Sequence, residues 1–560
     1  MPHKMIEHIE QSPNGDDYRE KLVAAEHGLR GDTVGITRII TMILALCWSL
    51  FQLASASILL LDTVYIRAIH LAFAISLVYF NIPMIKISGT SWRWDLRILL
   101  AMNRVTILDY LLGIIAAVSA LYIVLDYEGI ASRAGVPTTR DIIFGLMLVV
   151  LLLEATRRVI GPALPIIASI FILYVFTGPH LPDFLAFKGA SLSRFISQMT
   201  MDTEGIYGVP LHVSATVVFL FVLFGTMLER AGGGNFFIQL AISGLGRFRG
   251  GAAKAAVLGS ALTGVVSGSS IANVVTTGTF TIPLMKKVGY PPEKAAAVEV
   301  ASSINGQLAP PVMGAAAFII AELTGTPYLD VALATVIPAI LYFVSIFYMI
   351  DLEAYKEGLH GYAKDELPDA RKVLLERGHL VIPIFVLIFV LIGLNASVIK
   401  AAIWAIYSTI LCTFLRKSTR LTPEQFVAGF ADGAKQAVGL IAACATAGII
   451  IGVLNLTGTG LKFASGIIAL SGGILPGMLE LRPDGLPVRW SAEKGWVMDS
   501  TYDDGNPPLP YKFKLTHPDG YSAILLVKDR QKPNAAFRDD QLALELPAGT
   551  IIEPIKKGGN

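Results

Sequence analysis

Residues 255–285 read AAVLGSALTGVVSGSSIANVVTTGTFTIPLM and contain no charged side chain. The stretch exceeds the roughly 20 apolar residues that a helix needs to cross a bilayer. Its centre is polar, however, and reads Ser267-Gly268-Ser269-Ser270-Ile271-Ala272-Asn273. A bilayer tolerates irregular backbone only where protein or a water-filled cavity satisfies the backbone hydrogen-bonding groups. The stretch therefore predicts a hairpin with its tip at a cavity rather than a straight transmembrane helix.

Basic residues flank this stretch on both sides, with Lys254 before it and Lys286 and Lys287 after it. Lys and Arg collect in cytoplasmic loops of membrane proteins. Counted from a cytoplasmic N-terminus, the remaining Lys and Arg clusters also fall inside if residues 255–285 enter and leave the membrane on the same side. The charge pattern therefore predicts a re-entrant hairpin.

A second polar interruption follows in residues 295–323, which read AAAVEVASSINGQLAPPVMGAAAFIIAEL. Ser302-Ser303-Ile304-Asn305-Gly306 and then Pro310-Pro311 break the apolar run. Gly and Pro in mid-span expose carbonyls and helix ends, which is typical of the discontinuous helices of secondary transporters. We expect the hairpin tip and this broken helix to meet.

The oxygen atoms of these two segments suggest an ion. Freed carbonyls with Ser, Thr and Asn side chains form a neutral, hard-oxygen cage, which suits a small monovalent cation better than a transition metal. Sodium is the natural candidate. Small residues such as Gly259, Ala261 and Gly264 are equally suited to close helix packing, which explains most single Ser or Gly residues in membrane helices. The whole pattern contains more polar and helix-breaking residues than packing requires.

The composition agrees with a membrane protein. The 560 residues are 54% hydrophobic and 16% charged, against roughly 45–50% and about 25% in soluble domains, which excludes a water-soluble enzyme. A net charge of +2 without a run of five like charges excludes nucleic acid as a partner. Intervals without charge predict about ten to thirteen membrane segments: 39–61, 68–85, 110–125, 142–153, 159–182, 209–228, 255–285, 300–321, 331–350, 380–399, 401–415, 436–461 and 463–479.

Residues that could carry other chemistry have simpler interpretations. No nucleophile–base pair or metal cluster is present, so we expect no enzyme and no cofactor. Asp109 and Glu154 are expected near helix ends or paired with arginines, and Glu322 at the membrane interface. Five further residues are expected to be core or satisfied groups rather than ligands: Cys47, Cys412, Cys444, His212 and His379.

The ends of the chain differ from its centre. Residues 1–37 are polar, are not a cleavable signal peptide and are expected in the cytoplasm. Residues 476–560 alternate turns such as RPDG and HPDG with β-like runs such as YKFKL, YSAILLVK and LALEL, which predicts a soluble β-rich tail. The charge pattern puts this tail outside the cytoplasm unless 463–479 crosses back. We therefore expect an all-α polytopic membrane protein with a small β-rich C-terminal tail.

An internal repeat relates residues 224–243 (FGTMLERAGGGNFFIQLAIS) to residues 451–470 (IGVLNLTGTGLKFASGIIAL). Each contains the end of a span, a Gly-rich break and an amphipathic helix. The charge pattern makes the first span run inward and the second outward, which predicts an inverted repeat. After the second copy the chain continues into ALSGG and Pro476, and no second hairpin follows.

At SGSSIAN, ASSINGQLAPPV and LTGTGLKFASGIIALSGG, the chain resembles the large membrane subunit of tripartite ATP-independent periplasmic (TRAP) transporters. The spans in 38–160 resemble the small four-helix membrane subunit fused to it, and 161–475 the large transport domain with a truncated second repeat. The resemblance implies an elevator-type permease of the bacterial inner membrane. It implies sodium-driven uptake of an organic acid delivered by an extracytoplasmic substrate-binding protein.

The resemblance also implies site residues. A sodium-site pattern carries over to the following positions: Ser267, Gly268, Ser269, Ser270, Asn273, Ser302, Ser303, Asn305 and Gly306. Pro310 and Pro311 are candidates for contact with the substrate. The family's second hairpin, with its GMGLP-type motif, has no counterpart here, so slow transport is expected. The alternative is a transport-deficient membrane anchor that presents the C-terminal tail.

Overall fold

The computed structural model describes residues 36–82, 84, 106–133, 135–182, 186–267, 270–363, 366–460 and 462–463, together with six strands between 478 and 545. These residues form two compact units. The first comprises the described residues up to His180 and those from Lys188 to Leu456, and the second comprises the others. Most of the predicted segment 1–37, residues Gly268 and Ser269, and the predicted truncation near Gly473 lie outside the described residues.

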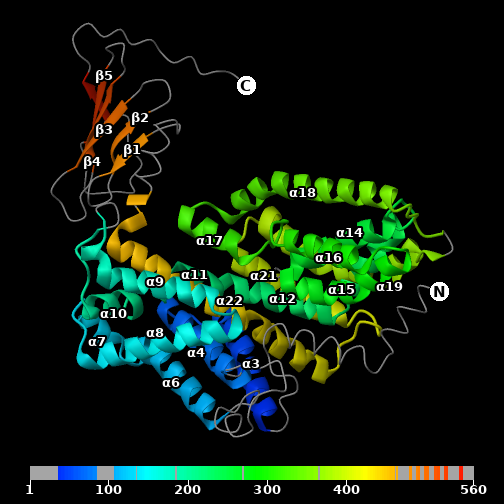
Figure 1. Ribbon diagram of the computed structural model, residues 1–560, viewed down its shortest axis with the longest axis horizontal. Helices are drawn as coiled ribbons and strands as arrows, with labels where there is room; N and C mark the ends of the chain where they lie inside the picture. Colours follow the sequence, from blue (N-terminus) through cyan, green and yellow to red (C-terminus); the bar gives the residue numbers. More distant parts are fainter. Residues whose placement is uncertain are drawn as a thin grey trace. The chain divides into compact units, whose positions relative to one another are not determined.

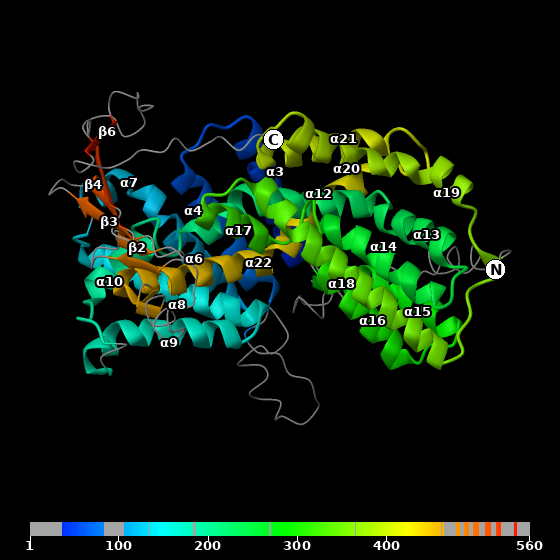
Figure 2. The same cartoon turned by 90° about the horizontal axis from the view of Figure 1, so that it is seen from above.

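The first unit is helical throughout. Its N-terminal helices are α3 (Ile36–Ser57), α4 (Thr63–Asn81), α6 (Ile107–Leu125), α7 (Tyr127–Ser132), α8 (Thr139–Val159) and α9 (Ala163–Thr177). Both α6 and α8 begin at a capping box, in which a Thr caps the helix and an Asp three residues later bonds back to it. Figures 1 and 2 show α4, α6 and α8 side by side.

The centre of the chain contains α10 (Leu192–Thr200), α11 (Val209–Val213), the π-helical turn η2 (Ser214–Val218), α12 (Phe219–Arg230), α13 (Gly233–Leu245), α14 (Gly251–Ser267), α15 (Ser270–Lys287), α16 (Pro292–Asn305), α17 (Ala315–Thr324) and α18 (Tyr328–Lys356). The unit ends with α19 (Ala370–Arg377), α20 (Ile382–Ile388), η5 (Phe389–Gly393), α21 (Val398–Thr413) and α22 (Pro423–Thr457). Short 3₁₀ turns lie at Gly178–His180 and Gly378–Val381.

Eight helical segments among the described residues are long and apolar enough to cross a membrane: Thr37–Ser57, Thr63–Asn81, Ile107–Leu125, Ala163–His180, Val209–Arg230, Tyr328–Lys356, Ala370–Gly393 and Pro423–Thr457. Each coincides with a predicted interval. The sequence-based number is higher because several intervals form other structures. Residues 255–285 and 300–321 form shorter helices, and α8 carries acidic and basic residues at its ends.

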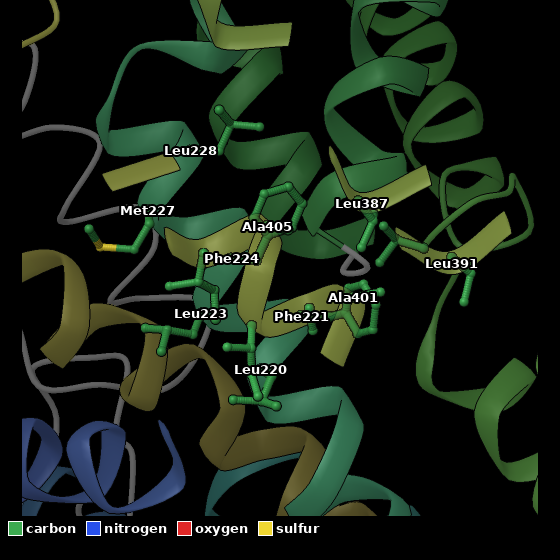
Figure 3. Packing of buried hydrophobic residues seen from close by; sticks show 14 of the residues in the cluster. Leu220, Phe221, Leu223, Phe224, Met227, Leu228, Leu387, Leu391, Ala401 and Ala405 are labelled. Carbon is green, nitrogen blue, oxygen red and sulfur yellow. The ribbon is translucent and has the colours of Figure 1, made fainter. Parts of the chain in front are cut away.

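The main hydrophobic core of the first unit surrounds α12. Figure 3 shows Phe221 and Phe224 of α12 among side chains of α20, η5 and α21, including Leu387 and Leu391. Ala401 and Ala405 of α21 are fully buried there. Because alanine side chains are small, α21 can approach α12 closely at these two positions.

Polar contacts join the N-terminal helices to the later ones. Gln52 of α3 donates to the carbonyl of Ala215, which lies in the π-helical turn. Thr156 of α8 and Thr446 of α22 share a hydrogen bond of 2.7 Å. The hydroxyl of Tyr207 donates to the carbonyl of Ala120, also at 2.7 Å. Helices α3, α6 and α8 are therefore anchored to the later part of the unit by buried hydrogen bonds, which are costly to leave unmade.

The second unit contains a six-stranded antiparallel sheet in which every strand pairs with the next in sequence. The strands are β1 (Met478–Leu481), β2 (Pro487–Ser491), β3 (Val497–Tyr502), β4 (Pro510–Thr516), β5 (Ser522–Val527) and β6 (Leu542–Glu545). In the register of β4 and β5, Phe513 lies opposite Leu525. A meander of this kind needs only short turns between strands.

Candidate cation site at the helical hairpin

Helices α14 and α15 form two antiparallel arms that pack on one another. The amide nitrogen of Asn273 on α15 donates to the backbone carbonyl of Ser260 on α14 at 2.7 Å. One turn further along α15, Thr277 also contacts the Ser260 hydroxyl at 3.4 Å. A straight span over 255–285 is thereby excluded, and the basic flanks lie at the same end of the hairpin, as the charge pattern predicted.

The base of the hairpin is held by ion pairs to the last turns of α18. Lys254 of α14 contacts Asp351 at 2.5 Å, and Arg249 pairs with the same carboxylate. Lys294 at the start of α16 pairs with Glu353 and Glu357. These pairs are partly exposed, so each contributes little alone, roughly 0–1 kcal/mol. Together they fix the open ends of α14 and α16 beside α18.

The tip of the hairpin lies against the end of α16. A Cβ atom added at Gly264 would lie 2.9 Å from the Cα of Gly306. Contacts this short leave no room for a side chain, so only glycine permits the two backbones to touch. Gly259 is similarly close to Ile238 of α13, at 3.2 Å. The packing interpretation of these two glycines is correct, and it brings the two polar segments together.

Helix α16 ends at Asn305, and an irregular segment leads from Gly306 to α17. The freed carbonyls of this segment have specific donors. The hydroxyl of Tyr328 on α18 donates to the carbonyls of Pro311 and Val312, at 2.9 and 2.6 Å. Tyr328 also stacks on Phe318 of α17 with ring centroids 4.4 Å apart. The break predicted from the sequence is therefore an ordered part of the fold.

The side chain of Asn273 has one defined orientation. A backbone carbonyl can only accept, so the atom facing the Ser260 carbonyl is the amide nitrogen. The same nitrogen contacts the hydroxyls of Ser260 and Ser303, at 2.9 and 3.2 Å. Among the described residues, the buried Oδ1 atom of Asn273 has no hydrogen-bond partner, and neither polar atom of the Asn305 side chain has one. Buried polar atoms without partners are rare in native proteins and indicate a site for a ligand.

One residue of this region was missed by the sequence analysis. Glu299 of α16 is fully buried. Its Oε1 atom accepts from Thr277 and lies 3.2 Å from the hydroxyls of Ser260 and Ser303, while its Oε2 atom accepts from Thr281. The cluster is therefore not the neutral cage that was expected, because it includes a carboxyl group. The sequence did contain a signal for Glu299, because a residue four positions before Ser303 lies on the same face of the helix.

The other predicted residues have different positions. Ser302 bonds back to the carbonyl of Val298 at 2.6 Å, and Ser270 accepts from Gln307 at 3.1 Å. Of Ser267 only the backbone is described, as the last residue of α14. Asn273, Ser303 and Gly306 are thus the predicted residues that the structure brings together, and Asn305 precedes Gly306 at the end of α16.

The charged groups outside the hairpin are as expected. Asp109 pairs with Arg158 at 2.7 Å, and Glu154 pairs with Arg157 and Arg158. His379 bonds to Thr419 at 2.9 Å. In the described part of the chain, no group of three or more His, Cys, Asp or Glu residues is arranged to hold a metal ion.

Comparison with known proteins adds independent information. A family model described as "Tripartite ATP-independent periplasmic transporter, DctM component" matches residues 147–481. The uncharacterized protein y4mL of Sinorhizobium fredii is 28% identical over 196 residues, which are 34% of this chain and 46% of y4mL. The uncharacterized protein YgiK of Salmonella typhimurium is 29% identical over 234 residues, which are 41% of this chain and 51% of YgiK.

A relative with a more informative name is the C4-dicarboxylate TRAP transporter large permease protein DctM of Pseudomonas aeruginosa. It is 28% identical over 215 residues, which are 38% of this chain and 49% of that protein. The chain thus spans about half the length of the curated relatives it matches.

Proposed function

Because the chain belongs to the DctM-component family of tripartite ATP-independent periplasmic transporters, we propose that it is the permease of a sodium-coupled secondary transporter. It is a multi-pass protein of the bacterial inner membrane. The observation that carries the proposal is the hairpin tip against the end of α16, where within the described residues the Oδ1 atom of Asn273 is buried without a hydrogen-bond partner, as are the side-chain polar atoms of Asn305, the last residue of α16.

Sodium fits the chemistry of this tip. Its ligands in proteins are hard oxygen atoms, as for other small hard cations. The tip offers the Oδ1 atom of Asn273 and the hydroxyl of Ser303, and Asn305 at the end of α16 is proposed to add its side-chain oxygen. In this proposal sodium drives transport and is carried across the membrane with the cargo, so it is a transported substrate and not a cofactor. The predicted residues Ser267, Gly268, Ser269 and Ser270 form part of the same proposal.

The proposed cargo is an organic acid delivered by an extracytoplasmic binding protein. The printed name of the Pseudomonas aeruginosa relative specifies C4-dicarboxylates, so a small carboxylate is the class to test first. Helices α15 and α17 both begin at breaks in the apolar segments, and a helix N-terminus favours an anionic carboxylate. Pro310 and Pro311 precede α17 and are proposed as part of this region. Residues 38–160 are proposed as the small-subunit equivalent.

Uptake into proteoliposomes tests the proposal. The purified chain is reconstituted, the binding protein is loaded with a labelled dicarboxylate, and an inward gradient of sodium or potassium is imposed. We expect accumulation with sodium, none with potassium, and collapse of the sodium-driven signal with a sodium ionophore. Binding of the loaded partner without accumulation under any gradient would instead support the membrane-anchor alternative.

A further inference from the structure

The Glu299 side chain is surrounded by hydroxyl groups from three helices. Ser260 comes from α14, Thr277 and Thr281 from α15, and Ser303 from its own helix. Gly278 of α15 lies against it as well, since a Cβ there would be 3.2 Å from the Cγ atom of Glu299. This one side chain therefore contacts both hairpin arms and α16 at once.

The direction of these hydrogen bonds follows from proton count. Each hydroxyl has one proton to donate and two lone pairs, whereas an ionised carboxylate can only accept. Hydroxyls that donate to Glu299 turn their lone pairs away from it. Ser260 and Ser303 also share a hydrogen bond 2.9 Å long, so one of them donates to the other and the second donates to Glu299. Both hydroxyls accept from the amide nitrogen of Asn273. The carboxylate and this hydroxyl pair thereby hold the amide nitrogen and fix the direction in which the Oδ1 atom of Asn273 points.

The charge of this carboxylate has no counter-ion within the described protein. Lys254 and Lys294 are engaged by Asp351, Glu353 and Glu357, and Lys286 and Lys287 of α15 are exposed. Asp109 of α6, in contrast, has the buried guanidinium of Arg158. A buried charge is expensive unless it is paired. An ionised Glu299 therefore needs a cation close by, which the described residues do not supply.

We propose that Glu299 is the positioning residue of the cation site. It orients the hydroxyls of Ser260 and Ser303 and supplies the negative charge that retains the ion at the unpartnered asparagine atoms. The ion itself contacts the tip, and Glu299 acts through the hydroxyls. This inference rests on the sodium coupling proposed above.

Sodium titration of thermal stability tests this role without requiring substrate or binding protein. An ion that binds only the folded state stabilises it by RT ln(1 + c/Kd), where c is the sodium concentration, so a fit of the unfolding temperature against c gives the dissociation constant, which is the half-saturating concentration. The purified chain is titrated with sodium chloride against choline chloride at constant ionic strength and pH. The variants are Glu299→Gln, which removes the charge at nearly constant size, and Glu299→Asp, which retains it. Glu293→Gln, an exposed Glu on the same helix, is the matched control.

We expect Glu299→Gln to raise the half-saturating sodium concentration by about tenfold or more, because it removes a unit charge close to the ion in a poorly solvated site. Glu299→Asp should fall between this variant and wild type, and Glu293→Gln should match wild type. Thr281→Val removes one hydroxyl that donates to Glu299 and keeps the carboxylate, so it should weaken sodium binding by about threefold. It provides a second test of the proposal if Glu299→Gln does not fold.

The outcomes separate the two proposals. If Glu299 has only a structural role, Glu299→Gln should be less stable than wild type without sodium, its half-saturating sodium concentration should be unchanged, and Glu299→Asp should not behave more like wild type. That result would overturn the inference. Wild-type protein without any sodium response would overturn both this inference and the sodium coupling on which it rests.

Discussion

Gly306 and Gly264 touch backbone to backbone. A Cβ atom at Gly306 would lie 2.7 Å from the Cα and 2.9 Å from the carbonyl carbon of Gly264. Helical hairpin and broken helix therefore meet at two residues that have no side chains. The polar atoms of Asn273 and Ser303 come within hydrogen-bonding distance because this contact is so close.

Substitution of either glycine tests that contact. Gly306→Ala inserts a methyl group against backbone, which cannot rotate away as a side chain can. We expect a loss of about 1–3 kcal/mol, seen as a lower thermal unfolding temperature in detergent, and weaker stabilisation by sodium. Gly244→Ala is the control, because its added Cβ would meet no atom within 4 Å. It should be neutral or slightly stabilising. Equal effects of the two substitutions would contradict the close approach.

Tyr328→Phe tests the order of the segment between α16 and α17. The change keeps the ring that stacks on Phe318 and removes the hydroxyl that serves the carbonyls of Pro311 and Val312. We expect a loss of about 1–3 kcal/mol for leaving these groups without a donor. Tyr348→Phe on the same helix, where the side chain is 65% exposed, should leave the unfolding temperature unchanged. An unaltered unfolding temperature in Tyr328→Phe would show that this segment does not depend on Tyr328.

Asp109→Asn tests the packing of α6 on α8. The change removes one of the two carboxylates that pair with the buried guanidinium of Arg158, the other being Glu154, so we expect a loss of about 1–3 kcal/mol. The matched control is Glu376→Gln, since the Lys372–Glu376 pair is about half exposed on both sides and should contribute under about 0.5 kcal/mol. Both are measured by thermal unfolding with intrinsic fluorescence. A loss in Asp109→Asn no larger than in the control would mean that the ion pair does not stabilise this region.

The sequence predicted the parts of the site that depend on local pattern. Asn273, Ser303 and Gly306 are conspicuous because polar and flexible residues interrupt apolar segments. The pairing of Asp109 and Glu154 with arginines also followed from the high cost of charge at membrane depth. The break after α16 followed from Gly and Pro.

Glu299 could not be placed in this way. The charge-free interval 300–321 begins immediately after it, so counting between charges makes Glu299 the boundary of a span rather than an interior residue. Its burial depends on α14 and α15, which are distant in sequence and pack on α16 only in the folded chain. The long apolar helices among the described residues are fewer than the predicted membrane segments for a related reason. Absence of charge does not distinguish one long helix from two short ones.

Direct binding of radioactive sodium to the purified chain is the most immediate test of the central claim, that the tip formed by Asn273 and the end of α16 holds sodium. We predict saturable binding to wild type that excess potassium does not displace. Asn273→Leu removes an oxygen ligand and should reduce the affinity by about tenfold or more, while Gln425→Leu, an exposed amide at the start of α22, should bind as wild type does. Saturable binding that is unchanged in Asn273→Leu would contradict the account, as would wild-type protein that binds no sodium.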